Sequence, residues 1–224
     1  MALSFISYSQ NGAANGTSST ISKPTGTQDG DIMFIFLSLG SSKTVTSVPT
    51  GWTNILSKTS GYITHHIYYK IASSEGTGYT FSFSAFSNGH LTTISTFRGD
   101  YDSSGTIIDY SSVEKGGSTE GNFVIPSFNI PISNSVIITL ASTFASSSTT
   151  FSPPTSPGIF TEHFDYGSAT PDFWQQVCSY QWASSGNTGN ITVVASSSVY
   201  DAIGVAIAIK MNSISNTSNF FQLF

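Results

Sequence analysis

The sequence predicts an all-β protein, an antiparallel and jelly-roll-like β-sandwich built from two sequence-related halves with approximate two-fold symmetry. Three observations carry this prediction. Segments of alternating apolar and polar residues, rich in aromatic and β-branched side chains, run along the whole 224-residue chain. Clusters of Gly, Pro, Asn and Ser separate these segments. The order of segments in the first half recurs in the second half, and no long amphipathic helical period interrupts either half.

The strands follow in chain order from this patterning. In the first half we expect strands at residues 3–9, 31–39, 62–72, 79–86 and 91–99. In the second half we expect them at 105–112, 122–128, 135–142, 173–183, 190–196 and 202–210. The segment DIMFIFLSL (31–39) is almost continuously apolar, which is typical of a central strand buried on both sides.

The internal repeat is the most specific feature of the sequence. FISYS (5–9) matches IIDYS (107–111), and residues 31–39 match 135–143 at an offset of 104. ASSEGTG (72–78) and ASSGNTG (183–189) match at an offset of 111. The order and spacing indicate two copies of one supersecondary unit, against the alternative that Ser/Thr-rich strands look alike by chance. Each of these turns is expected to join two long antiparallel strands, with Gly78 and Gly189 supplying a permissive backbone.

The repeat also sets the expected domain organisation. Residues 1–99 and 105–210 form the two units, and 211–224 form a C-terminal tail. Each unit is expected to have one apolar face, and two units laid face to face would bury both faces in a single sandwich. The alternative is two separate domains, but each sheet would then need its own cover.

The composition excludes several classes of function. Charged residues make up only 8 % of the chain, where about 25 % is usual, and the net charge is −5. Without a basic stripe, direct nucleic-acid binding is not expected. Neither a signal peptide nor an apolar run of about 18 residues is found, so we expect no membrane insertion and folding in a cytoplasm. A neutral Ser/Thr surface suits packing against other subunits or binding of uncharged polar ligands.

Few residues offer chemistry. Adjacent strand residues point to opposite faces, so His65 and His66 are not expected to share a metal ion, and one is expected to be half-buried and the other exposed. Glu162, His163 and Asp165 are too few to define a zinc site, and the DGD at 29–31 lacks the rest of a calcium loop. The lone Cys178 is expected in the core. The sequence therefore predicts a protein that is not an enzyme and has no cofactor or metal.

A set of short motifs resembles a family of Ser/Gly/Thr-rich proteins found widely in bacteriophage genomes. Members typically read P-x-G-x-x-x-G-D, P-x-G-W and Y-x-K-x-A, followed by a closing strand that ends in Y/F-R-G. The matching residues are Pro24, Gly26, Gly30 and Asp31; Pro49, Gly51 and Trp52; Tyr68 or Tyr69, Lys70 and Ala72; and Phe97, Arg98 and Gly99. The resemblance covers about residues 1–210, and the second copy lacks the Gly-Asp and Pro-x-Gly-Trp pieces.

The resemblance implies a jelly-roll-like virion component and supplies no catalytic residues. The leading hypothesis is a capsid decoration or cement protein, made in the host cytoplasm, that binds the major capsid protein or other virion subunits and is itself a homo-oligomer, for which we expect a trimer. The alternative is a tail or fibre adhesin for host carbohydrate, and a free carbohydrate-binding module is a third class. Candidate sugar-stacking aromatics are Tyr62, Tyr79, Tyr101 and Trp174.

The motif residues themselves have mechanical interpretations. Pro24 to Asp31 reads as a turn that enters a central strand, and Pro49-Thr50-Gly51 reads as a turn in which Gly51 permits positive φ. Trp52 is expected to pack beneath that turn, with a ligand-stacking platform as the alternative. Arg98 is expected to satisfy carbonyl groups or a carboxylate at a strand end, with Asp100 and Asp102 as candidates.

The C-terminal tail is the expected docking element. Residues 211–224 read MNSISNTSNFFQLF, polar at first and then strongly apolar. Burial of large apolar side chains is favourable, so we expect the tail to dock into a neighbouring subunit, with docking on the protein's own sandwich as the alternative. The expected docking residues are Phe220, Phe221, Leu223 and Phe224.

Overall fold

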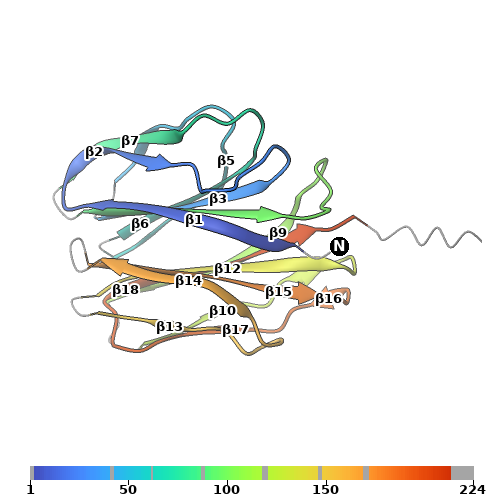
Figure 1. Ribbon diagram of the computed structural model, residues 1–224. Coiled ribbons are helices and arrows are strands. Elements are labelled where there is room, and N and C mark those ends of the chain that lie inside the picture. The colour runs from blue at the N-terminus through green and yellow to red at the C-terminus, as the bar shows by residue number, and fades with distance from the viewer. Residues whose placement is uncertain are drawn as a thin grey trace, which may run out of the picture.

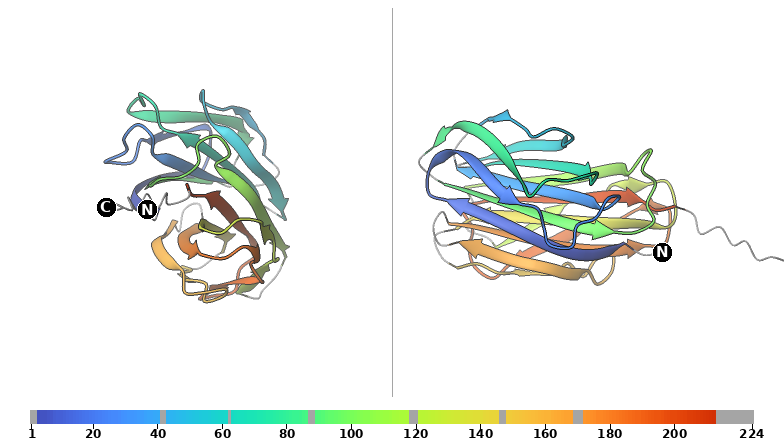
Figure 2. Two further views of the ribbon diagram at one scale, coloured as in Figure 1. Left: turned by 90° about the vertical axis from the view of Figure 1, so that its right-hand side faces the viewer. Right: turned by 45° about the horizontal axis from the view of Figure 1, so that its top comes forward.

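The computed structural model describes residues 3–40, 43–61, 63–86, 89–117, 121–145, 148–168 and 172–212. The all-β prediction is confirmed, since the described residues form several antiparallel sheets and no helix. The strands stack in four layers, with two large sheets in the middle and a smaller sheet outside each of them (Figure 1). Figure 2 shows the same stack from two further directions.

The first half of the chain supplies one large sheet and one small sheet. The large sheet has the order β1 (Ser4–Ala13), β8 (His90–Arg98), β3 (Ile32–Gly40), β6 (Ile63–Ile71) and β5 (Thr53–Ser60). The small sheet has the order β2 (Gly16–Ser22), β7 (Gly78–Phe86) and β4 (Val45–Ser47).

The second half supplies the other two layers. Its large sheet has the order β14 (Thr161–Ser168), β15 (Phe173–Trp182), β12 (Ser135–Phe144), β18 (Asp201–Lys210) and β9 (Ile107–Gly116). A small sheet of β10 (Asn122–Ile125), β17 (Ile191–Ala195) and β13 (Phe151–Ser152) lies outside it. A separate pair joins β11 (Asn129–Ile130) to β16 (Gly186–Asn187).

The central strands are buried on both faces because the large sheets are covered on both sides. Every residue of β3 is buried, as its continuous apolar sequence predicted. Alternate side chains of β3 point to different cores: Phe34 and Phe36 face β12 and β18 of the other large sheet, whereas Ile35 and Leu37 face the small sheet β2-β7-β4. The expectation that each unit has only one apolar face is therefore wrong.

The repeated seven-residue turn has a different role from the expected one. It leads from β6 to β7 and, in the second half, from β15 toward β17, and in both halves those strands belong to different sheets. The turn therefore carries the chain from a large sheet to its outer sheet, and it does not close a hairpin. Gly189 has φ of +73°, whereas Gly78 has no positive φ and is required instead by a close approach, since a Cβ there would lie 2.7 Å from the Ile21 carbonyl oxygen.

All four outer strands of the two large sheets carry a β-bulge. The extra residue is Ile6 in β1, Ile55 in β5, Ile108 in β9 and His163 in β14. The inner pairings of β3 and β12 with their neighbours run without any register shift. Bulges twist an exposed strand edge and make it a poor template for pairing with another chain.

Candidate functional site

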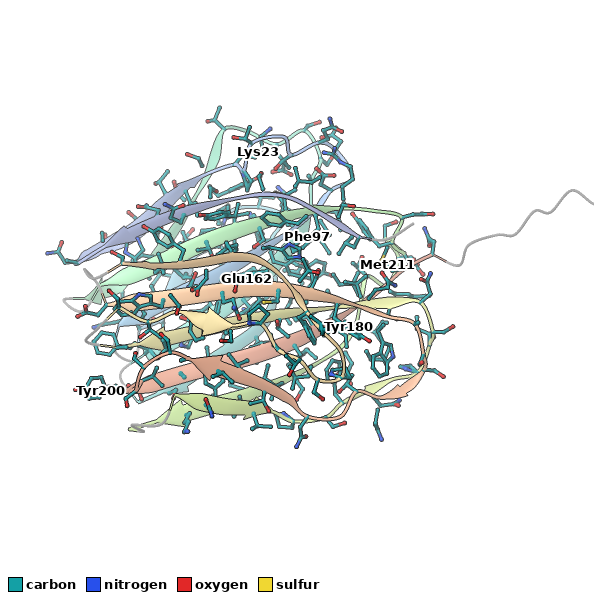
Figure 3. The ribbon with its side chains drawn as sticks, turned by 60° about the horizontal axis from the view of Figure 1, so that its bottom comes forward. Lys23, Phe97, Glu162, Tyr180, Tyr200 and Met211 are labelled. Carbon is teal, nitrogen blue, oxygen red and sulfur yellow. The ribbon has the colours of Figure 1, made fainter. Side chains whose placement is uncertain are left out.

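Three places in the described residues bring polar side chains together: a corner made by the motif residues, a buried network between the large sheets, and a pocket at one end of the molecule. Figure 3 shows that this end carries Met211, while Tyr200 lies at the opposite end. None of the described residues forms a helix long and apolar enough to cross a lipid bilayer.

The motif corner ties the Gly-Asp turn to the closing strand. Asp31 is buried, and Arg98 donates to it through two nitrogens, Nε to Oδ1 at 2.7 Å and Nη2 to Oδ2 at 2.8 Å. Arg98 also donates to the carbonyl oxygen of Gly26 at 2.9 Å. The predicted type of partner for Arg98 is therefore right, but the carboxylate is Asp31, which lies far back in the sequence, and neither Asp100 nor Asp102. The hydrogen bonds to Asp31 raise the pKa of Arg98 above its ordinary value.

The same corner fixes the repeated turn of the first half. The Ser74 backbone N–H, at a residue with φ of +52°, donates to Oδ1 of Asp29 at 2.7 Å. The Ala72 N–H donates to the Asp31 carbonyl oxygen, and the Gly30 N–H donates to the Ala72 carbonyl oxygen. The Gly-Asp motif therefore stabilises a chain reversal through backbone and side-chain hydrogen bonds, without ligating an ion.

A lysine connects the remaining two motifs. Nζ of Lys70 lies 2.8 Å from Oε2 of Glu75 and donates to the Thr50 carbonyl oxygen at 3.2 Å. Burial acts to raise the pKa of Glu75, but hydrogen bonds from Lys70, the Ser73 N–H and Tyr79 outweigh it and lower that pKa. Gly30 and Gly51 have φ of +87° and +88°, and Pro24 accepts the Thr27 N–H through its carbonyl oxygen. These motif residues position turns.

Three of the proposed sugar-stacking aromatics are buried, which corrects the sequence-based expectation of an exposed platform. Tyr79 packs edge-on against Trp52, and Trp52 is itself a core residue, as predicted. Tyr101 lies in the core between the large sheets and donates its hydroxyl to the Gly30 carbonyl oxygen at 2.6 Å. Trp174 belongs to the core of the second half. The fourth proposed aromatic, Tyr62, lies outside the described residues. The predicted turn residue Pro49 precedes the turn at Thr50 and Gly51.

The second place is a buried polar network between the large sheets. Oγ of Ser38 lies 2.9 Å from Oγ of Ser142 and 3.0 Å from Nδ1 of His65. Gln175 donates to Ser38 through Nε2 at 2.8 Å, and its Oε1 accepts the Thr93 hydroxyl at 2.7 Å. Among the described residues, Nε2 of His65 has no hydrogen-bond partner. Burial and the neighbouring His66 hold the pKa of His65 well below its ordinary value, so the ring is neutral at pH 7.

The two adjacent histidines point to opposite faces of β6, as predicted, but neither is exposed. His66 contacts Oγ of Ser57 at 2.8 Å through Nδ1, and its pKa is lowered mainly by burial. The expectation of one exposed ring is wrong because a small sheet covers the outer face of β6. The opposite faces keep the two rings from sharing one ion.

The Glu162–His163–Asp165 segment is split by the bulge in β14. His163 turns toward the other half, where it stacks on Phe5 with ring centroids 4.6 Å apart. Asp165 faces its own half and accepts the Phe151 N–H at 2.7 Å; burial, together with repulsion from Glu162, raises its pKa to about 6. Within the described part of the chain, no group of three or more His, Cys, Asp or Glu side chains is placed to hold a metal ion.

Cys178 is buried in the core of the second half, as predicted. Burial is the main cause that raises the pKa of its thiol, so the thiol is protonated at neutral pH. A protonated and inaccessible thiol is a poor nucleophile, which is consistent with a packing role.

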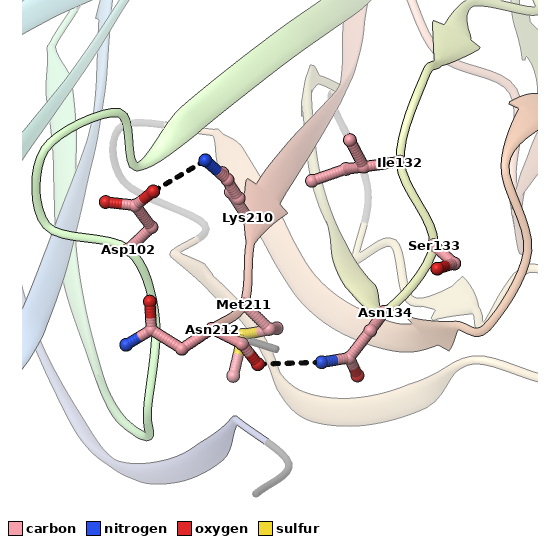
Figure 4. Close-up of a pocket in the computed structure, with 7 residues that line it drawn as sticks. All are labelled: Asp102, Ile132, Ser133, Asn134, Lys210, Met211 and Asn212. Atoms are coloured by element: carbon pink, nitrogen blue, oxygen red, sulfur yellow. Dashed lines mark hydrogen bonds and ion pairs between the residues drawn. The ribbon is translucent and has the colours of Figure 1, made fainter. Parts of the chain in front are cut away.

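The third place is a pocket of 570 Å³ at the end of the body where residue 212 is the last one described (Figure 4). Nζ of Lys210 lies 2.6 Å from Oδ2 of Asp102, and Nδ2 of Asn134 donates to the Asn212 carbonyl oxygen at 3.0 Å. Hydrogen bonds from Lys210 and Ser104 lower the pKa of Asp102. The lining residues are Asp102, Ile132, Ser133, Asn134, Lys210, Met211 and Asn212.

This pocket was not predicted from the sequence. Its residues come from the link between the halves, the loop before β12 and the segment at the end of β18, which are separated along the chain and share no motif. The sequence repeat gave no signal for it, because the offset of 111 places Ile209, and not Lys210, opposite Arg98. The predicted docking residues Phe220, Phe221, Leu223 and Phe224 lie outside the described residues. Comparison of the chain with protein-family models, with curated proteins and with solved structures finds no match.

Proposed function

We propose that the chain is a bacteriophage virion structural protein, a decoration or cement protein that binds across neighbouring capsid subunits. The observation that carries this proposal is the charge-free outer face of the sheet β2-β7-β4. Its outward side chains are hydroxyl-bearing, and Oγ1 of Thr20 lies 2.9 Å from Oγ1 of Thr80 on the neighbouring strand. The exposed members of this face, called the hydroxyl face below, are Ser18, Thr20, Ser22, Ser47 and Thr80.

Such a face is suited to binding another protein. Charged residues are depleted in the centres of protein interfaces, because removing a charge from water is costly unless it finds a partner. Hydroxyl groups can exchange hydrogen bonds with water for hydrogen bonds with a partner at small net cost. The opposite outer sheet differs, since it exposes Val124 and Val194. The proposal therefore assigns contact with the capsid to the hydroxyl face.

A cosedimentation assay tests the assignment. Thr20→Lys would place an unpaired ammonium on the hydroxyl face and weaken binding to particles that lack the protein by about tenfold or more, since a buried unpaired charge is costly. Ser152→Lys, at an exposed position on the opposite outer sheet, is the matched control and leaves binding unchanged. Equal binding of both variants and the unmodified protein would remove the hydroxyl face as the capsid-contacting surface.

The alternative function, an adhesin for host carbohydrate, was predicted from a platform of exposed aromatic side chains. Tyr79, Tyr101 and Trp174 are too deeply buried to stack on a sugar. The exposed tyrosines of the described residues are Tyr8, Tyr110 and Tyr200, and Tyr8 is already stacked on Phe164. No cluster of aromatic side chains in the described residues therefore favours sugar binding over protein binding.

We also propose that the two halves are duplicated jelly-roll-like units. In a jelly roll, the first, eighth, third and sixth strands share one sheet, and the second, seventh and fourth lie in the sheet that faces it. The strands β1 to β8 follow this arrangement, except that β5 joins the larger sheet. If β9, β10, β12, β13, β14, β15, β17 and β18 are taken as the eight counterparts, the second half has the same strand order.

The positions of the bulges support this proposal. Ile6 and Ile108, the extra residues of β1 and β9, occupy the same place in the matched pair FISYS and IIDYS. Ile55 and His163 are likewise equivalent when Trp52 is aligned with Phe160, both of which are buried.

Contacts between equivalent residues support an approximate two-fold axis between the large sheets. Ser38 and Ser142 are equivalent at the offset of 104, and their hydroxyl oxygens are 2.9 Å apart. The pairings of β8 and β18 with the central strands make Asp100 and Asn212 equivalent, and Nδ2 of Asn212 donates to Oδ1 of Asp100 at 2.6 Å. Two copies related by a two-fold axis bring equivalent residues together only on that axis.

A further inference from the structure

We propose that the pocket at the tail end receives a phenylalanine side chain from the C-terminal segment 220–224 of a second copy of this chain. The inference rests on the proposed duplication and deepens the proposed virion role, because it names the contact through which copies associate. Its starting point is a difference between two places that the approximate two-fold axis relates.

In the first half, the counterpart of the pocket is filled by the chain itself. Tyr101 follows β8, is 7 % exposed and lies in the core between the large sheets, where its hydroxyl donates to Gly30. The counterpart of Gly30 at the offset of 104 is Asn134, which lines the pocket. The counterpart of Tyr101, one residue after Asn212, is Ser213. The second half therefore has a small polar residue at the sequence position where the first half has a large aromatic one.

The polar partners around the pocket are rearranged in a matching way. Lys210 takes the position of Arg98, but the position of Asp31 is held by Ser135, whose hydroxyl has no hydrogen-bond partner among the described residues. Lys210 pairs instead with Asp102 from the link between the halves. The Lys210–Asp102 pair satisfies the charges at the rim, while Ile132 and Met211 give the pocket an apolar wall.

The length and sequence of the chain beyond residue 212 favour its apolar end as the occupant of the pocket. Seven residues, SISNTSN (213–219), precede an apolar end that contains Phe220, Phe221, Leu223 and Phe224. Seven extended residues span at most about 25 Å, enough to reach the same pocket on a copy that meets this end of the molecule. The pocket is lined by Lys210, Met211 and Asn212 themselves, so return to its own pocket would require the chain to reverse within seven residues, whereas an extended spacer carries the apolar end to a neighbouring copy.

The start of the tail is held at the rim of the pocket. The side chain of Asn212 donates to Oδ1 of Asp100 at 2.6 Å and to the Tyr101 carbonyl oxygen at 3.2 Å, and its own carbonyl oxygen accepts from Asn134. Asn212, the last described residue before the tail, and the receiving pocket therefore lie at one end of the molecule. Two copies that meet through these ends can exchange tails reciprocally, which is a closed and symmetric arrangement.

Isotope-encoded disulfide trapping of the full-length chain tests this proposal. The double variant Ser133→Cys/Phe221→Cys places one thiol on the pocket and one on the tail, and the native Cys178 is buried. Equal amounts of ¹⁴N- and ¹⁵N-labelled protein are mixed, unfolded and refolded together so that copies assemble at random, then oxidised mildly and digested, and the cross-linked peptides are identified by mass spectrometry. The matched control is Thr20→Cys/Phe221→Cys, whose first thiol lies on the hydroxyl face.

The expected result is a yield of cross-links carrying both labels about tenfold or more above the control, because docking raises the effective concentration of the tail at the pocket. Cross-links that carry only one label would show that the tail occupies its own pocket, and a yield no higher than the control would show that the pocket is not the receptor. Either outcome overturns the proposal. Particle binding is measured separately, so loss of the virion role would leave the trapping result intact.

Discussion

Single glycines decide several of the chain reversals in this fold. Gly61 follows β5, has φ of +51°, and a Cβ there would overlap the carboxylate of Asp201. Asp201 is fully buried and accepts the Gly117 N–H at 3.2 Å, so it cannot move aside into solvent. The first half and the second half therefore meet at a position where any side chain larger than hydrogen is excluded.

Substitution of Gly61 should be more damaging than substitution of a glycine that is left-handed but uncrowded. Gly61→Ala combines the left-handed strain with a clash, and Gly189→Ala at φ of +73° has strain alone, because nothing lies near its Cβ. We expect Gly189→Ala to lower the free energy of unfolding by about 1–2 kcal/mol and Gly61→Ala by a further ~1–3 kcal/mol. Denaturant unfolding measures both, and equal losses would show that Asp201 gives way.

Residue-scale prediction from sequence was best where one residue type has one physical use. Positive φ at Gly51 and burial of Trp52 and Cys178 follow from the chemistry of those residues. The partner of Arg98 did not follow, because a carboxylate 67 residues away was brought near only by the pairing of β3 with β8. The prediction that Tyr79 and Tyr101 are exposed was wrong, because an amphipathic ring can be buried once its hydroxyl has a hydrogen-bond partner.

At the scale of elements, the centre of each large sheet differs from its edges. β3 and β12 pair on both sides without a register shift and are covered on both faces, whereas the four outer strands are bulged and open along one edge. Amide exchange in a strand paired and covered on all sides requires opening of the whole unit.

Hydrogen exchange should rank the strands accordingly. Amides of β3 and β12 should exchange last and by global unfolding, while those of β5 and β9 exchange earlier through local opening. The measurement is hydrogen–deuterium exchange with peptide-level mass spectrometry at neutral pH. Exchange in β12 at the rate of β9 would contradict the assignment of β12 as the centre of the second half.

The sequence predicted the long, apolar strands and missed several polar ones. β2, β5 and β14 are rich in Ser, Thr and other polar residues because each has an exposed face or edge, so their alternation is weak. β7, β10 and β17 were predicted as strands, but their arrangement in separate outer sheets was not predicted. Without those layers, one apolar face per unit was the natural conclusion, although the continuous apolar run of β3 already required cover on both sides.

At the scale of the whole molecule, three of the four histidines are buried, His163 is half-buried, and all four have lowered pKa values. Burial is the main cause in each case, and it lowers the pKa of His90 and of His163 to about 4. The unfolded chain binds protons at these rings from about pH 6.5 downward, whereas in the folded chain His90 and His163 stay neutral until about pH 4 and His65 and His66 also resist protonation. The histidines therefore contribute stability that is complete above pH 6.5 and is lost as the pH falls through this window.

Acid should consequently destabilise the protein between pH 6.5 and 4. Asp165 opposes the trend, because its pKa of about 6 in the folded state means that its stabilising effect is present at low pH and is lost as the pH rises through 6. Four groups against one leave a net loss of stability on acidification. His163→Phe retains a ring against Phe5 and removes one titrating group, so it should reduce the proton uptake on unfolding near pH 5 by about one. Chemical denaturation across the pH range measures this uptake, and an unchanged slope would contradict the assignment.

The core between the large sheets also bears on how such a molecule arises. Each half carries its own second layer, so among the described residues the large apolar surface that remains on each half is the one that faces the other half. A gene for one half would therefore encode a product with one exposed apolar surface, and two copies of that product could associate through it. If the two halves arose by the proposed duplication, fusion of two such genes would convert that association, which depends on concentration, into a permanent one, and each half could then change independently.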